Sequence, residues 1–181
     1  ALGNSIKIGF LATVFSTILG TMIAFAIGRY AFKGRSTSNL LIFLPMATPE
    51  IVLGASLLSL FLVFHINPGF WPTVIAHVMF CISFVVVTVK ARIASLDPRL
   101  EQAAMDLYAN ELETFRKVTL PLVAPGIAGA ALLAFSLSFD DFIITNFNSG
   151  TLKTFPEFVY TSAARGIPAQ ANVIGSAMFF L

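Results

Sequence analysis

Charged side chains are scarce in this sequence of 181 residues. Lys and Arg number 11 and Asp and Glu number 9, together 11% of the chain, where a soluble domain carries about 25%. Hydrophobic residues make up 57%, 19 of them Phe, and the mean hydropathy is +0.87. Because so few charges cannot cover the surface of a 19.5 kDa particle, the composition excludes a water-soluble globule and favours lipid as the surrounding medium.

The scarcity of cysteine, histidine and basic charge excludes several classes of function. The single cysteine, Cys81, excludes a disulfide framework and a thiolate metal site, and we expect it to be a packing residue. His65 and His77 do not have the spacing of a metal pair, so no metal is expected and both are interpreted as interfacial or packing residues. A net charge of +2 without a basic stripe argues against nucleic acid.

No lysine motif with a glycine-rich phosphate loop occurs either. We therefore expect no catalytic residue and no cofactor on this chain, and any ATP-driven step must draw on another protein.

Long apolar runs are the main positive feature. A bilayer core of about 30 Å needs about 20 predominantly apolar residues per helix. Runs of this kind, continuous and without period-two alternation, predict an all-α membrane protein rather than a barrel. They cover residues 6–30, 40–64, 70–89 and 122–147, with a fifth beginning near residue 169 and cut off at residue 181. We treat residues 1–181 as one transmembrane domain, and since the chain starts without Met and stops in mid-run we expect it to be a piece of a longer protein.

The positions of Lys and Arg predict the orientation. Eight of the 11 lie in the links after the first and third spans: Arg29, Lys33, Arg35, Lys90, Arg92, Arg99, Arg116 and Lys117. Lys7, Lys153 and Arg165 fall on the opposite side, and the link at residues 65–69 has none. The two basic links should therefore face the cytoplasm.

Small residues recur every fourth position in the first and fourth spans: Gly20, Ala24 and Gly28, then Gly126, Ala130, Ala134 and Ser138. Such stripes let helices approach closely in lipid, within one chain or against a partner subunit. The alternative is that Ala and Gly are simply common in membrane helices.

The cytoplasmic segment 90–121 has the pattern of folded structure. Asp97 before Pro98 is a helix-start signal, and an apolar face follows at Leu100, Ala103, Ala104, Leu107 and Tyr108. A second start is predicted at Asn110 with Glu113 as a capping box, in a helix lined by Leu112, Phe115 and Val118 that Pro121 closes. A solvated hairpin that only joins two spans is the alternative.

This segment resembles the EAA loop of ABC importer membrane subunits. The residues that carry the resemblance are Glu101, Gln102, Ala103, Ala104, Met105, Asp106 and Leu107, then Phe115, Val118, Leu120 and Pro121. The resemblance implies a coupling helix that docks on a cytoplasmic ATPase, with Glu101 and Ala104 as contact points. Tyr108 stands where that family usually has Gly, so either Tyr108 adopts the turn conformation or the turn falls later, near Asn110.

Nearly the whole chain is similar to permeases of the spermidine and putrescine branch. The similarity is carried by Asn4 and Ser5, by Leu44, Pro45 and Pro49 to Gly54, and by Ser138 to Phe142. It implies the type I ABC importer permease fold, with about five of six helices present, in a prokaryotic plasma membrane. The implied partners are a second related permease subunit, an ATPase dimer that binds ATP and Mg, and an external substrate-binding protein.

Glu50 lies inside the second apolar run, after Pro45 and Pro49, which should kink or break the helix. A carboxylate at this depth costs about 2.5–3.5 kcal/mol, so we expect it to face the bundle or a wet cavity. It either lines the substrate path or caps broken backbone.

Asp140 and Asp141 lie near the outer end of the fourth run. Adjacent helical residues point about 100° apart, so only one of the two can face a central path, while the other bonds backbone or another helix. For a polycationic substrate, the aspartate that faces the path would supply a counter-charge. The alternative is that the two aspartates are a solvated interfacial pair. A permease for another solute, or an ion-coupled transporter or channel that uses Glu50 and the aspartates, also remains open.

Overall fold

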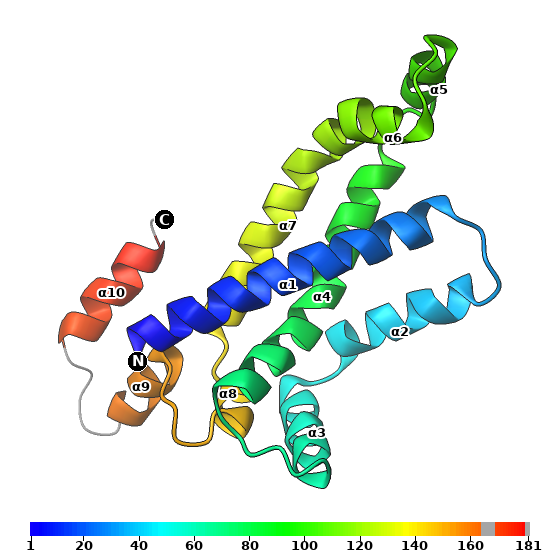
Figure 1. Ribbon diagram of the computed structural model, residues 1–181. Helices are drawn as coiled ribbons and strands as arrows, with labels where there is room; N and C mark the ends of the chain where they lie inside the picture. Colours follow the sequence, from blue (N-terminus) through cyan, green and yellow to red (C-terminus); the bar gives the residue numbers. More distant parts are fainter. Residues whose placement is uncertain (164–168, 180–181) are drawn as a thin grey trace.

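The computed structural model describes residues 1–163 and 169–179, and within that part of the chain all regular structure is helical (Figure 1). Its elements are α1 (Leu2–Arg29), α2 (Arg35–Ala47), α3 (Glu50–Val63), α4 (Phe70–Ala94), α5 (Arg99–Asp106), α6 (Glu111–Thr114), a π-helix (Phe115–Thr119), α7 (Leu120–Asp140), α8 (Ile143–Asn148), α9 (Phe155–Ala163) and α10 (Ala169–Phe179). The predicted outer charge at Arg165 and the end of the fifth run at Leu181 lie outside the described residues.

Among the described residues, three helical segments are long and apolar enough to cross a membrane. They are α1 with 28 residues, α4 with 25, and a continuous helix of 30 residues over Glu111–Asp140 that comprises α6, the π-helix and α7. The first and third predicted spans are confirmed, although α4 continues to Ala94. The fourth differs, because it stops at Asp140 and not near residue 147.

The second predicted span is not one helix. It consists of α2 and α3, which meet at an angle of 107°. Thr48 and Pro49 are both extended there, with ψ of 132° and 133°, as expected for a proline and the residue before it. The predicted break is therefore confirmed, whereas a continuous span over 40–64 was wrong.

The small-residue stripes lie in helix contacts. In Figure 1, α1 crosses α4 and α7, and Gly20 and Ala24 are buried. A Cβ on Gly20 would lie 2.7 Å from Cγ1 of Val85 on α4, closer than side chains tolerate. On α7, Ala130, Ala134 and Ser138 are buried. The stripes thus serve close packing within this chain, which decides against mere composition.

Pro121 does not close the second cytoplasmic helix, contrary to the prediction. The π-helix at Phe115–Thr119 precedes it, and the Leu120 amide donates to the Phe115 carbonyl, five residues back. This wider turn admits a proline near the start of α7, where its missing N–H costs little. The cytoplasmic segment therefore runs into the membrane span as one rod.

Arg92 binds this continuous helix near the start of α7. Its Nε and Nη2 donate to the Leu122 carbonyl at 3.1 and 2.9 Å, near Pro125, which supplies no amide to the helix. A Cβ on Gly126 would lie 2.6 Å from Cγ of Arg92, so the glycine makes room for the arginine. A residue counted only as a cytoplasmic charge thus also ties α4 to α7.

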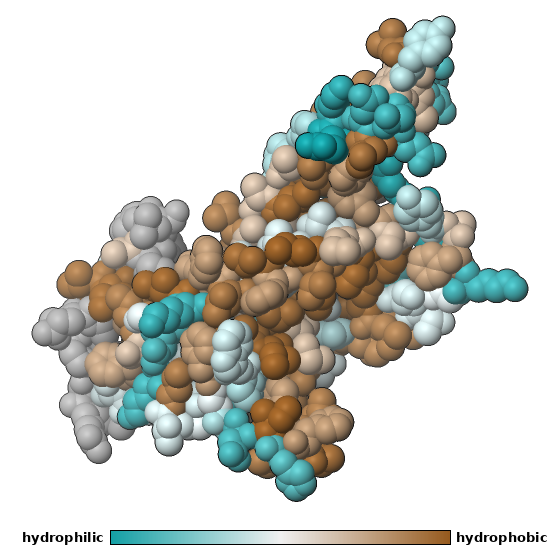
Figure 2. All heavy atoms as spheres, in the orientation of Figure 1, coloured by the Kyte–Doolittle hydropathy of each residue, from teal (hydrophilic) through white to brown (hydrophobic). Residues whose placement is uncertain are grey.

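The two ends of the molecule are polar and the middle is apolar. Figure 2 shows hydrophobic residues in a band along α1, and hydrophilic residues at the end that carries α5 and at the opposite lower side. Ser5 and Asn4 at the start of α1 bind the link before α9, through the Phe155 amide at 2.7 Å and the Lys153 carbonyl at 2.9 Å. Lys7 and Lys153 therefore share one end, as predicted, and Arg29 lies at the other with α5.

Candidate substrate path and coupling segment

Three carboxylates gather at the end opposite α5. Asp140 is the last residue of α7, Asp141 follows it, and Glu50 is the first residue of α3. The α3 helix packs on α8, the helix that follows Asp141, because Gly54 of α3 lies against Ile144 and Phe147 of α8. Glu50 lies near enough to both aspartates for their charges to repel it.

The two aspartates diverge, as their adjacency predicted. Asp141 is 8% exposed, and its carboxylate accepts from the amides of Ile144 at 3.4 Å and Thr145 at 2.9 Å. It therefore caps α8. Asp140 is exposed, and so is Glu50. No side chain caps the start of α3, and this chain does not cover the Glu50 carboxylate; that it faces the bundle or a wet cavity of the assembled transporter stays a prediction.

Neither exposed carboxylate has a cationic partner in the described part of the chain. The ion pairs there join Arg29 to Glu101 and Lys117 to Glu113, and His77 Nε2 lies 3.5 Å from Asp141 Oδ2. Two unpaired carboxylates at a membrane-spanning bundle are costly unless a cation or a wet cavity meets them. The cluster of Glu50, Asp140 and Asp141, called the acidic cluster below, can therefore attract cations.

His77 is a polar residue that the sequence analysis took for packing or interface. It is 1% exposed, and its ring nitrogens lie 2.7 Å from Ser138 Oγ and 2.9 Å from Thr145 Oγ1. The signal was present in the sequence, since Ser138, Asp141 and Thr145 are spaced by three and four residues. The sequence does not show that the packing of α4 places His77 beside Ser138, Asp141 and Thr145. His65, by contrast, is exposed at the α3–α4 link.

At the other end, α5 begins as predicted. The Arg99 amide donates to Asp97 Oδ1 at 2.9 Å, and the predicted capping box is present, with the Glu113 amide donating to Asn110 Oδ1 at 2.9 Å and the Asn110 amide to Glu113 Oε2 at 3.3 Å. The predicted helix starts in segment 90–121 are therefore confirmed, while the choice between a coupling segment and a hairpin that only joins two spans stays a prediction.

The end of α5 differs from its apolar pattern. The helix stops at Asp106, and Tyr108 takes the left-handed conformation with φ of 66°. The Ala109 amide donates to the Ala104 carbonyl and the Tyr108 amide to that of Met105, a Schellman arrangement. Of the two options for the turn, Tyr108 itself makes it. Its side chain is 98% exposed and that of Leu107 82% exposed.

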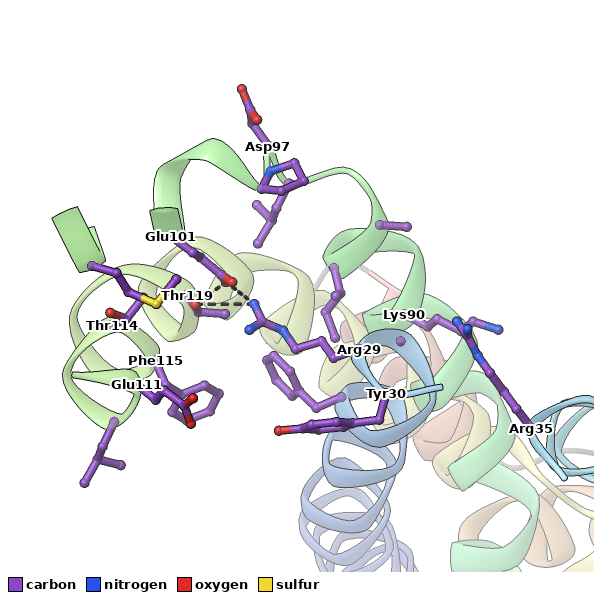
Figure 3. A pocket seen from close by; sticks show the side chains of 18 residues that line it. Arg29, Tyr30, Arg35, Lys90, Asp97, Glu101, Glu111, Thr114, Phe115 and Thr119 are labelled. Carbon is purple, nitrogen blue, oxygen red and sulfur yellow. Dashed lines mark hydrogen bonds and ion pairs between the residues drawn. The ribbon is translucent and has the colours of Figure 1, made fainter. Parts of the chain in front are cut away.

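The predicted coupling residues split into two groups. Ala103, Asp106, Leu107, Leu120 and Pro121 are exposed, and Ala104 is partly buried. Glu101 instead turns inward, where it pairs with Arg29 of α1 and accepts from Thr119 Oγ1 at 2.5 Å. Figure 3 shows Arg29, Glu101 and Thr119 pointing toward one another at a groove of about 990 Å³ between α1, α4, α5 and α6.

This contact sets the charge state of Glu101. Partial burial raises the pKa of its carboxyl, but the hydrogen bonds from Arg29 and Thr119 and the charge of Arg29 outweigh burial and hold the pKa below its ordinary value. Beside it, Phe25 of α1 packs edge-on against Phe115 of the π-helix, with ring centroids 5.3 Å apart. The end of α1 thus contacts both α5 and the π-helix of segment 90–121, which is called the coupling segment below.

Arg29 and Thr119 were missed as functional residues. The sequence analysis counted Arg29 as a topology charge and gave Thr119 no role. Nothing in the local pattern links either of them to Glu101, which lies 72 residues after Arg29.

Long apolar helices packed through small residues, with a short helix α5 at one end, are the features of a polytopic membrane protein. Residues 6–156 match the family described as the inner membrane component of binding-protein-dependent transport systems. The chain belongs to this family. It is a multi-pass membrane subunit of an ABC transporter, and the family implies an ATPase and a substrate-binding protein as partners in general terms.

Curated relatives agree. The chain is 36% identical over 179 residues to a spermidine/putrescine transport system permease of Haemophilus influenzae, covering 98% of this chain and 70% of that protein. It is 37% identical over 185 residues to a putrescine transport system permease of Escherichia coli, covering 97% and 66%.

Solved structures show the same fold. An inward-facing methionine ABC transporter superposes with a TM-score of 0.79 at 14% identity, over 98% of this chain and 85% of that one. An amino acid ABC transporter superposes with a TM-score of 0.74 at 20% identity, over 99% and 84%. The predicted type I importer fold is confirmed.

Proposed function

We propose that this chain forms, with a second related permease subunit, the membrane path for polyamines such as spermidine or putrescine. The observation that carries the proposal is the acidic cluster, where the exposed carboxylates of Glu50 and Asp140 have no ionic partner in the described residues. The names of the relatives support the same substrate class.

The chemistry of the cluster fits this substrate. A polyamine carries ammonium groups spaced along a flexible chain, and each ammonium needs a counter-charge when it leaves water. Glu50 and Asp140 come from different helices, α3 and α7, so they can meet separate ammonium groups. Asp141 is occupied by backbone amides and contributes charge rather than direct contact.

Energy reaches the path from the ATPase through α5. Exposed Leu107 and Tyr108 offer an apolar tip for docking, while Glu101 ties the helix to α1 and the rod over Glu111–Asp140 leads to the acidic cluster. Because packed helices shift as bodies, displacement of α5 by ATP-driven closure of the ATPase would move α1 and α7 together. ATP and Mg are bound by the ATPase in this scheme, and this chain carries out no chemistry.

Uptake by the complete complex in proteoliposomes tests the proposal. With binding protein outside and ATP inside, labelled spermidine or putrescine should accumulate, and Asp140→Asn should reduce the initial rate about tenfold, which corresponds to about 1.4 kcal/mol. Glu157→Gln, an acidic residue of α9 outside the cluster, is the matched control and should transport normally. Normal uptake by Asp140→Asn, or uptake of another solute in place of polyamines, would contradict the proposal.

A further inference from the structure

We propose that His77 is a positioning residue for the substrate path: it locks the break between α7 and α8 and thereby fixes where Asp140 points. The inference rests on the proposed function for what the path carries, but its structural part does not.

One imidazole joins three elements. His77 belongs to α4, Ser138 to α7 and Thr145 to α8, and both ring nitrogens are within hydrogen-bond distance of a hydroxyl. Asp141 Oδ2 lies 3.5 Å from the same Nε2. His77, Ser138, Asp141 and Thr145 are all buried, so water does not compete for these contacts.

The hydroxyls of Ser138 and Thr145 can each donate or accept, so they can serve either neutral tautomer of His77. Thr145 Oγ1 lies 3.2 Å from both the Asp141 carbonyl oxygen and Asp141 Oδ2. When the threonine hydroxyl donates to one of these, it accepts from His77 Nε2–H, and His77 Nδ1 accepts from the Ser138 hydroxyl. In either tautomer both ring nitrogens have a buried partner.

The set holds the α7–α8 break. After Asp140 the backbone becomes extended, with ψ of 122° at Asp141, and α8 has only 6 residues. A helix this short is not stable alone, so its direction depends on the bonds that Asp141 and Thr145 make. Since Asp140 is the last residue of α7, the same bonds determine where its carboxylate leaves the helix.

Removal of the ring should release the break. In His77→Leu the hydroxyls of Ser138 and Thr145 lose a buried partner, an unfavourable change for each group. In His77→Gln the side-chain amide reaches the place of Nε2 and can still donate to Thr145. The two variants therefore separate loss of the contact from loss of the imidazole itself.

The test uses the purified whole complex with two readouts. Hydrogen exchange of the amides of α8 should rise at least tenfold in His77→Leu and stay within threefold of wild type in His77→Gln. Polyamine carried per ATP hydrolysed should fall at least fivefold in His77→Leu at nearly unchanged ATP hydrolysis, because Asp140 is displaced while α5 is intact. Ser83→Ala, another buried polar residue of α4, should leave both readouts at wild-type values.

Wild-type exchange and wild-type transport per ATP in His77→Leu would overturn the inference, as would equal damage in His77→Gln and His77→Leu. If His77→Leu does not assemble, Thr145→Val and Thr145→Ser take its place. Only valine should release α8, and the opposite order, or no release by valine, overturns the inference. Absence of polyamine uptake by the wild-type complex would contradict the proposed function instead. Hydrogen exchange of the α8 amides would still test the role of His77.

Discussion

Glu101, the acidic residue of segment 90–121, is bonded within this chain. The resemblance implied that Glu101 contacts the ATPase, which stays a prediction, and its carboxylate is bonded to Arg29 and Thr119. We infer that a residue bonded in this way transmits the position of α5 to α1. The exposed residues Leu107 and Tyr108 are then the better candidates for contact with the ATPase.

A charge exchange tests this role. Arg29→Glu places two like charges together, and we expect polyamine carried per ATP to fall about tenfold. The double variant Arg29→Glu with Glu101→Arg restores the attraction and should recover transport to within about threefold of wild type, as in a double-mutant cycle. Lys117→Glu replaces an exposed ion pair with Glu113 by two exposed acidic residues, which solvent screens, and should have little effect on transport. Failure of the double variant to recover while both singles are damaged would contradict the role.

The lowered pKa of Glu101 gives this pair a defined pH dependence. A carboxyl whose pKa is lower in the folded state stabilises the protein above its ordinary pKa, and this stabilisation is lost as the pH falls through the lowered value. The difference in thermal unfolding between the wild-type complex and Glu101→Gln should therefore be constant from pH 7 to about pH 5.5 and shrink only below the ordinary value of 4.5. A difference that already disappears between pH 7 and 5.5 would show that another group is titrating.

Tyr108 holds a conformation that a side chain disfavours. With φ of 66° it is strained relative to glycine by about 1 kcal/mol, and its exposed ring loses no contact within this chain when removed. Tyr108→Gly should raise the unfolding temperature of the permease, measured in detergent without the ATPase, slightly or leave it unchanged. Ala109→Gly, at a position without positive φ, should lower it, and the reverse order would refute the assignment of the turn to Tyr108.

At the scale of elements, close contact between α1 and α4 depends on Gly20. Gly20→Ala would place a methyl group 2.7 Å from Cγ1 of Val85, and the resulting separation of the helices should destabilise the chain by about 1–3 kcal/mol. Gly129→Ala on α7 meets nothing within 4 Å and should be neutral or stabilising. Thermal unfolding of the two variants in the same detergent measures this, and equal stability of both would rule out a tight contact at Gly20.

The elements also show what could be predicted. Hydropathy and helical period predicted α1, α4 and the start of α5, since these depend on residues close in sequence. A kink or break in the second span was predicted from Pro45 and Pro49. The chain breaks at Pro49, while Pro45 lies inside α2. The angle of 107° was not predicted, because it depends on what α3 packs against. Pro121 was wrongly predicted to end the helix, because the apolar pattern of the sequence does not show the π-helix that precedes the proline.

The candidate site divides in the same way. The spacing of Asp140 and Asp141 predicted that they diverge, and the structure decides that Asp141 is the buried one. His77 was predicted as a packing or interfacial residue and is buried, but its partners and those of Arg29 were not predicted, because they lie 61 and 72 residues away along the chain. Contacts over such separations are set by the packing of helices and not by local sequence.

In the whole molecule, two functional regions lie at opposite ends and are connected by long helices. The coupling segment lies at one end and the acidic cluster at the other (Figure 1), and α1 and the rod over Glu111–Asp140 connect them. The arrangement requires that α5 rests on the ATPase during transport and that its position controls the path.

A disulfide cross-link between α5 and the ATPase tests this requirement most directly. Leu107→Cys places a thiol on an exposed position at the end of α5, while the native Cys81 is buried and does not compete. With a cysteine introduced on the ATPase surface, we expect a cross-link that stops uptake and is reversed by reductant, and none from Thr151→Cys at the opposite end. Uptake that continues unchanged with α5 fully cross-linked, or transport with no cross-link formed at any ATPase position, would contradict the account.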